Sequence, residues 1–138
     1  MAGKSAYLED KGLNWMKGTA FGTAPTTVYV ALFTTNPTAD DGTGAVEVSG
    51  GAYARASITT SSGWSAISGS GVSPHQISNA GVVTFATPTA NWGTVIGIGI
   101  YDALTAGNLL YWNSITSQVI NTGVIASFAV GALVITDD

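Results

Sequence analysis

The residues that could do acid–base or nucleophilic chemistry are few in this sequence and form no catalytic pattern. His75 is the single histidine, and a serine triad would need it beside a nucleophile and a carboxylate. No serine stands in a Gly-x-Ser-x-Gly motif, which exposes a nucleophile at a strand-to-helix turn. The acidic residues are scattered and show no pairing suited to glycoside hydrolysis. We therefore expect His75 to be a solvent-exposed loop residue and the protein not to be an enzyme.

Metal and phosphate sites have equally little support in the sequence. The chain has no cysteine, which excludes disulfides and thiolate ligands. Residues 40–42 (Asp-Asp-Gly) are more typical of an Asx-rich turn than of a calcium loop. Residues 3–5 (Gly-Lys-Ser) match the end of a phosphate-binding loop but lack its upstream glycine and its preceding strand. No metal or cofactor is expected.

The composition points instead to a surface that other subunits cover. Charged residues are only 9% of the 138 residues, and hydrophobic residues are 46%. An ordinary soluble domain has about 25% charged residues. Because depletion of charge is typical of interface cores, we expect much of the surface to pack against neighbouring subunits. The alternative is a neutral β-domain that a coat of Ser and Thr keeps soluble.

The charge balance and the longest apolar run exclude two further classes of partner. Binding to nucleic acid needs clustered Lys and Arg, whereas the net charge here is −4. The most apolar run, residues 123–135, is shorter than the ~20 residues that span a bilayer, and no signal peptide is visible. We expect neither direct nucleic acid binding nor a membrane partner.

One short helix is predicted near the N-terminus, over residues 5–17. Its large side chains, Tyr7, Leu8, Trp15 and Met16, are too apolar to stay in water, and a helix this short gains its stability from packing. They must therefore pack either on the open end of their own domain or on a neighbouring subunit. We favour the second, a helix that docks at a subunit interface.

From residue 26 onward the hydrophobic period changes to two, which indicates β-strands. Strands are expected over residues 26–35, 45–48, 52–60, 81–87, 94–101, 109–115 and 124–135. Residues 26–35 are apolar on both faces and should form a central strand covered from both sides. The Ser/Gly-rich residues 59–79 are expected to form a long surface loop.

These elements predict an all-β fold, an antiparallel β-sandwich or jelly-roll-like domain with a short N-terminal helix. The chain, residues 1–138, is expected to form one domain with an N-terminal helix or arm over 1–20 and the sandwich over 26–136. Glu47 and Arg55 flank a Gly-Gly turn and could pair across a hairpin. Gly97 and Gly99, on one face of residues 94–101, indicate close backbone approach.

Five stretches of the sequence carry a resemblance to a known family. They are residues 28–38 (Val-Tyr-Val-Ala-Leu-Phe-Thr-Thr-Asn-Pro-Thr), 47–55 (Glu-Val-Ser-Gly-Gly-Ala-Tyr-Ala-Arg), 90–95 (Ala-Asn-Trp-Gly-Thr-Val), 97–103 (Gly-Ile-Gly-Ile-Tyr-Asp-Ala) and 107–110 (Gly-Asn-Leu-Leu). Taken in order, the chain resembles a family of small virion structural proteins of tailed bacteriophages, among them tail fibre proteins. Similar small β-proteins decorate capsids. The resemblance implies a structural role in the virion after synthesis in the host cytoplasm, and no active-site residues.

Three functions are open at this point. The first is a capsid decoration (cement) protein, expected as a homotrimer, that binds the assembled lattice of the major capsid protein and stabilises the head. The second is a tail or tail-fibre component that contacts other tail proteins or the host surface. The third is a carbohydrate-binding module that stacks sugars on its aromatic rings. The residues expected at an interface are Tyr7, Leu8, Trp15, Met16, Trp64 and Trp112.

Overall fold

The computed structural model describes residues 3–69, 71 and 74–137. Parts of the expected arm (1–2), of the expected loop (70 and 72–73) and the last residue (138) lie outside the described residues. The elements are β1 (Gly3–Lys4), α1 (Ala6–Met16), β2 (Thr27–Thr35), β3 (Val46–Glu47), β4 (Ala56–Thr59), β5 (His75–Ser78), β6 (Val83–Thr84), β7 (Gly93–Tyr101), β8 (Leu109–Ile120), β9 (Ser127–Phe128) and β10 (Val134–Asp137). The fold is all-β and sandwich-like, as the sequence predicts.

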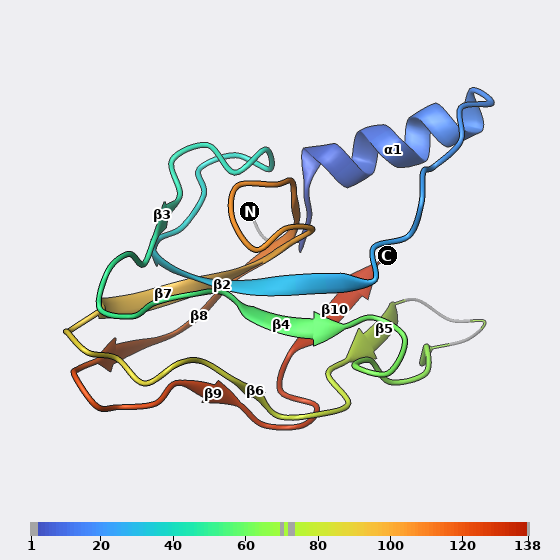
Figure 1. Ribbon diagram of the computed structural model, residues 1–138. Helices are drawn as coiled ribbons and strands as arrows, with labels where there is room; N and C mark the ends of the chain where they lie inside the picture. The colour runs from blue at the N-terminus through green and yellow to red at the C-terminus, as the bar shows by residue number, and fades with distance from the viewer. Residues whose placement is uncertain (1–2, 70, 72–73, 138) are drawn as a thin grey trace.

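An antiparallel sheet in the order β1-β8-β7-β2-β3 forms the centre of the molecule, and β4 pairs with the same edge of β2 as β3 does. Below the sheet in Figure 1 lie the pairs β5–β10 and β6–β9, and above it lie α1 and two loops. The expectation of a central β2 covered on both faces is confirmed. Val30 and Leu32 belong to the larger hydrophobic cluster, while Ala31 and Phe33 belong to a second cluster on the other face.

The two glycines of β7 lie where neighbouring groups leave no room for a side chain. A Cβ on Gly99 would come within 2.6 Å of the Phe33 ring, and one on Gly97 would overlap the side chain of Asn36. The predicted close approach is therefore confirmed. Strict alternation along residues 94–101 would place Val95 on the same face as the two glycines. It instead joins the opposite cluster, because the register shifts between Val95 and Gly97.

The expected long loop at residues 59–79 and the expected strand at 124–135 are both wrong, and for a common reason. Within the first segment, β5 pairs with β10, and Trp64 bridges to Asn79. The second segment divides into β9 and β10 around a turn at Gly131, whose φ is +78°. Strand pairing between the two distant segments thus replaces the expected loop and the expected continuous strand.

Asn79 fixes that turn from inside the molecule, where it is buried. Its Nδ2 donates to the carbonyl oxygens of Gly81 (2.7 Å) and Ala129 (2.8 Å). Its Oδ1 accepts from the Leu133 amide at 2.8 Å. The bonds to Ala129 and Leu133 join residues around the turn to the segment before β6, and the bond to Gly81 lies within that segment. A single side chain thus pairs with three backbone groups.

Other strand ends differ from the expected ones in simpler ways. β3, β4 and β6 are shorter than residues 45–48, 52–60 and 81–87. The start of the expected strand at 52 is lost because Ala52 has a φ of +63°, which belongs to a turn. β8 continues five residues past 115, because residues up to Ile120 still pair with β7.

Candidate functional site

The side chains of Glu47 and Arg55 form an ion pair beside two tyrosines, and we name Glu47, Tyr53, Arg55 and Tyr101 the Arg55 junction. Arg55 Nε donates to Glu47 Oε1 at 2.9 Å, and its second terminal nitrogen donates to Oε2 at 2.8 Å. The Tyr53 hydroxyl also donates to Oε1, at 2.8 Å. The guanidinium lies 3.7 Å from the centre of the Tyr101 ring. The pair does not cross a hairpin, because β3 and β4 each pair with β2 instead of with each other.

The Arg55 junction ties three separate parts of the chain together. Arg55 Nη1 donates to the carbonyl oxygens of Ala103 and Ala106, both at 2.8 Å, which holds the loop between β7 and β8. The Tyr53 hydroxyl accepts from the Leu32 amide at 3.0 Å. Burial raises the pKa of Tyr53, so its hydroxyl stays protonated and keeps donating. These bonds occupy the polar groups of the junction, which makes it a structural joint.

The residues that could do chemistry are dispersed. His75 is exposed on β5, and among the described residues no three His, Cys, Asp or Glu side chains are grouped to hold a metal. Asp41 accepts from the Thr43 amide at 2.8 Å, which is the Asx turn that residues 40–42 predict. In the described part of the chain, no helix is long and apolar enough to cross a membrane.

Helix α1 is fastened to the sheet at its N-terminal end. Ser5 is fully buried, its amide donates to Leu110 O at 2.8 Å, and its hydroxyl donates to Leu109 O. The same hydroxyl caps the helix, which is a role that serine fills well. The amide of Ala6 donates to Asp40 O at 3.0 Å. Tyr7 and Leu8 then pack against the larger hydrophobic cluster.

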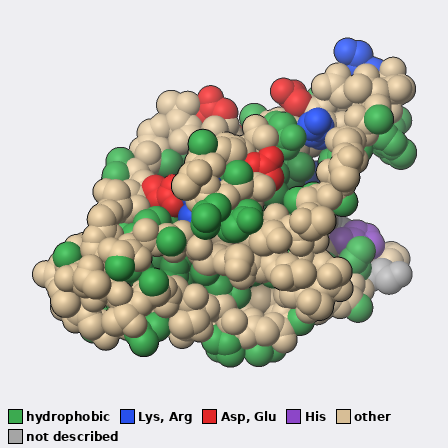
Figure 2. Space-filling model, viewed as in Figure 1, with side chains coloured by type: hydrophobic (Ala, Val, Ile, Leu, Met, Phe, Trp, Pro, Cys, Tyr) green, Lys and Arg blue, Asp and Glu red, His purple; other side chains and the backbone are tan. Residues whose placement is uncertain are grey.

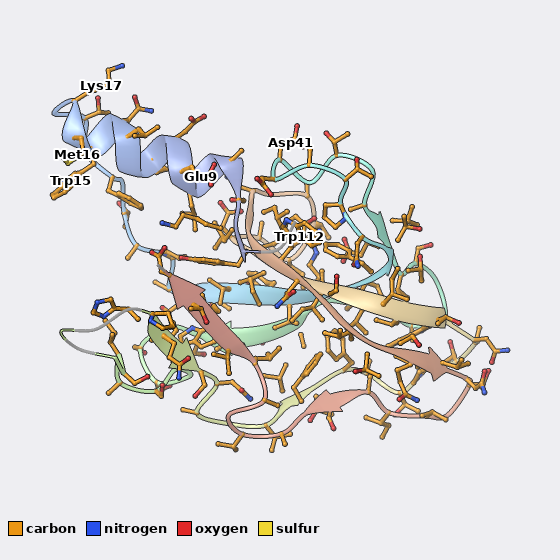
Figure 3. All side chains as sticks on the ribbon, turned by 180° about the vertical axis from the view of Figure 1, so that it is seen from behind. Glu9, Trp15, Met16, Lys17, Asp41 and Trp112 are labelled. Carbon is orange, nitrogen blue, oxygen red and sulfur yellow. The ribbon has the colours of Figure 1, made fainter. Side chains whose placement is uncertain are left out.

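The other end of α1 extends beyond the sheet with its apolar side chains uncovered. The exposed fractions are 66% for Leu13, 61% for Trp15 and 76% for Met16. We name these three residues the helix tip. Figure 2 shows hydrophobic side chains gathered at this free end, and Figure 3 shows Trp15 and Met16 on one side of it with Lys17 on the other. Of the four helix residues predicted at an interface, Tyr7 and Leu8 pack against their own domain, whereas Trp15 and Met16 are exposed.

The two other predicted interface residues lie within the domain. Trp112 is buried in the second hydrophobic cluster, among β2 and β8 residues, and Figure 3 places it inside the body. Trp64 is half-buried and packs against the larger cluster. The expectation that Trp112 lies at a surface is wrong, because β1 pairs with β8 at this residue and the loops above the sheet cover that face.

A groove lies between the second half of β8 and the segment that leads into β9, and we name it the β8 groove. It has a volume of about 410 Å³. Leu32, Val95 and Ile120 are its buried apolar residues, and Val124 and Ile125 at its rim are about half exposed. Every described residue that lines it is uncharged. The groove is thus an open, uncharged surface that is mainly apolar but also includes Thr116, Gln118 and Ser127. The end of β8 and strand β9 lie at a distance from the free end of α1 in Figure 1.

Sequence reasoning missed the β8 groove and one residue of the helix tip. Leu13 stands three residues before Met16, a helical spacing that could have placed both on one face. The expected continuous strand over residues 124–135 does not predict that Val124 and Ile125 lie at the rim of the β8 groove. No local signal marks the groove, because its lining comes from β2, β7, β8, β9 and the segment before β9.

One comparison with known proteins identifies the family. The family model described as Podophage GP4 fiber I protein gp80 matches residues 3–136, which is nearly the whole chain. The search of curated proteins gave no match. The family match agrees with the resemblance to phage virion structural proteins and, within it, with fibre proteins more closely than with capsid decoration proteins. The chain therefore belongs to the phage family of fiber I protein gp80 and is a structural protein of the virion.

Proposed function

We propose that this chain is a non-catalytic building block of a phage tail fibre, which assembles with copies of itself and with other tail proteins. The observation that carries the proposal is the helix tip, an apolar surface held away from the body in a protein of a fibre family. Contiguous exposed apolar surface on a soluble protein marks an interaction site. Self-assembly as a homotrimer is part of this proposal.

The balance of charge inside the molecule supports assembly as the role. The only arginine of the chain is used internally by the Arg55 junction, and Lys4 pairs with Asp137 at 2.6 Å. Because these cations are already paired within the chain, we expect an interface to rely mainly on apolar contacts. Charged residues are depleted in interface cores, so the 9% charge content suits a subunit that is covered by its neighbours.

Capsid decoration and sugar binding receive less support. The family match names a fibre protein, which favours the tail over the head lattice. Among the tryptophans, Trp112 is buried, and Trp64 is half-buried and packs on the core, so neither offers a fully open ring. A sugar site would need open aromatic faces.

The number of copies in a purified particle separates the tail from the head. Quantitative gel densitometry of the virion should show this protein at a small fraction of the molar amount of the major capsid protein. Cryo-electron microscopy of the same particles should place it on fibres. A molar amount comparable to that of the capsid protein, with density on the shell, would overturn the fibre assignment and support decoration.

Self-assembly is tested separately on the purified chain. Removing residues 1–17 would also remove β1 and the packed Tyr7 and Leu8, so the cleaner variant is Trp15→Ser combined with Met16→Ser. Light scattering after size exclusion should show an oligomer for the unmodified chain and a monomer for the double variant. The double variant Tyr29→Phe with Lys17→Ala is the control and should remain an oligomer. An unmodified chain that stays monomeric at all concentrations contradicts self-assembly.

A further inference from the structure

The helix tip and the β8 groove are two uncovered, uncharged surfaces on different parts of the molecule. The tip offers an aromatic ring and two flexible aliphatic side chains. The groove offers about 410 Å³, which has room for a tryptophan ring and a neighbouring side chain. An amphipathic helix that lays apolar residues into an apolar groove is a recurring mode of recognition. The two features match in chemistry, because both are uncharged and mainly apolar.

We propose that the helix tip of one copy docks into the β8 groove of a second copy. The proposal rests on the proposed self-assembly and names the surface that receives the helix. The chain cannot make this contact with itself. In Figure 1 the free end of α1 lies at the upper right, whereas the end of β8 and strand β9 lie at the lower left. The bonds of Ser5 and Ala6 to the sheet and to Asp40 fix where the helix starts.

The charges around both surfaces permit this contact. Every described residue of the β8 groove is uncharged, so no carboxylate or ammonium group would be buried unpaired. On the tip, Lys17 points to the side opposite Trp15 and Met16, so it stays in solvent when they dock. A second copy thus brings an apolar surface to an apolar surface at no cost in buried charge.

The area that the helix tip alone can cover is smaller than that of a standard interface. Covering the exposed parts of Leu13, Trp15 and Met16 removes on the order of 400 Å² from solvent on the tip side. This is about half of the roughly 800 Å² that each partner contributes to a standard interface. Phe21, just after the helix, is also about half exposed and extends the surface. Because tip and groove are different surfaces, the contact runs head to tail, and three copies can close it into a ring.

Cysteine cross-linking tests the proposal directly, because the chain contains no cysteine of its own. One batch carries Met16→Cys and a second, size-tagged batch carries Ile125→Cys. After mixing and mild oxidation, a non-reducing gel should show a disulfide-linked heterodimer. The matched control replaces the second batch by Val46→Cys, because Val46 (51% exposed) and Ile125 (53% exposed) are equally accessible but Val46 lies on β3. The Ile125 pair should give several-fold more heterodimer than the Val46 pair.

A charge placed in the groove gives a second, independent measurement. Ile125→Asp should shift the assembly towards monomer in sedimentation, whereas Val46→Asp should leave it unchanged. Equal cross-linking of the two pairs, or an oligomer that Ile125→Asp leaves intact, would overturn the docking proposal. In both of these cases the oligomer persists and the fibre location in the particle is unaffected, so the proposed function survives. Only a monomeric chain or a head location would count against the proposed function itself.

Discussion

The Arg55 junction and the helix tip use their side chains in opposite ways. In the junction, a guanidinium that is 7% exposed meets a carboxylate, two carbonyl oxygens and an aromatic face. At the tip, Trp15 and Met16 are mostly exposed and pack against nothing in their own chain that covers them. Interior polar groups lower the free energy of folding only when they are paired. The contrast indicates that the few charges hold the fold together and the uncovered apolar groups are left for partners.

Asn79 belongs with the junction in this comparison, since it is also a buried polar joint between distant segments. Asn79 and the Arg55 junction should contribute to the stability of the fold, whereas the helix tip should contribute to association between copies. Each of the following changes tests one side of that division, in order of the expected change in the free energy of unfolding.

Asn79→Ala should have the largest effect on stability. It removes three hydrogen bonds and leaves the amide of the buried Leu133 without its partner, while the carbonyl groups of Gly81 and Ala129 belong to exposed residues. We expect a loss of about 4 kcal/mol in the free energy of unfolding, measured by urea denaturation. Asn14→Ala, at an exposed position on α1, is the control and should change stability by less than about 0.5 kcal/mol. A similar small change at Asn79 would show that the turn is held by other contacts.

Arg55→Ala should lower the free energy of unfolding slightly less than Asn79→Ala does. It leaves Glu47, whose side chain is 27% exposed, without its cation and frees the loop carbonyls of Ala103 and Ala106. The expected loss is about 3 kcal/mol, again by urea denaturation. The free energy of unfolding of Arg55→Lys should lie between those of Arg55→Ala and the unmodified chain. An ammonium group keeps the charge but cannot reproduce the bidentate bond or the stacking on Tyr101. If Arg55→Lys were as stable as the unmodified chain, charge alone would suffice and the geometry of the junction would not matter.

The ion pair of Lys4 and Asp137 should contribute little, and its contribution should depend on pH. The hydrogen bond to Asp137 raises the pKa of Lys4 above its ordinary 10.5. A raised pKa means that the stabilisation is fully present below pH 10.5 and is lost as the pH rises through the folded-state value. Both side chains are more than a third exposed. Solvent screening therefore limits the contribution of the pair to the free energy of unfolding to about 0.5 kcal/mol.

Lys4→Met isolates that contribution. The difference in free energy of unfolding between the unmodified chain and Lys4→Met should be constant from pH 7 to about pH 10 and should shrink at higher pH. A difference that grows with pH has the wrong sign for a raised lysine pKa and would contradict the assignment.

Trp15→Ser combined with Met16→Ser should have the smallest effect on folding. Both side chains are largely in solvent, so the free energy of unfolding of the monomer should change by less than about 0.5 kcal/mol. Self-association should nevertheless be lost. A large loss of monomer stability would show that the tip packs on its own domain and would remove the contrast with the Arg55 junction.

Local rules determined a definite part of this protein from the sequence alone. The alternation of residues 27–35 and 93–101 produces β2 and β7 because side chains of a strand point alternately to its two faces. Gly97 and Gly99 predicted the close approach of neighbouring groups to one face of β7. The pairing of Glu47 with Arg55 was predictable from their opposite charges on either side of a Gly-Gly turn, although the expected hairpin does not form. The low charge content predicts a surface that other subunits cover, and that stays a prediction.

Only the tertiary structure decided what depends on contacts between distant residues. The helical pattern places Leu8 and Trp15 on the same face, but the sheet ends between them, so Leu8 packs and Trp15 does not. The pairing of β5 with β10 overrode the loop-like composition of its segment, because backbone bonds and the buried Asn79 outweigh weak local preferences. The β8 groove has the same origin. Its walls come from strands that are far apart in sequence, and only the packing of the β6–β9 pair against the central sheet brings them together.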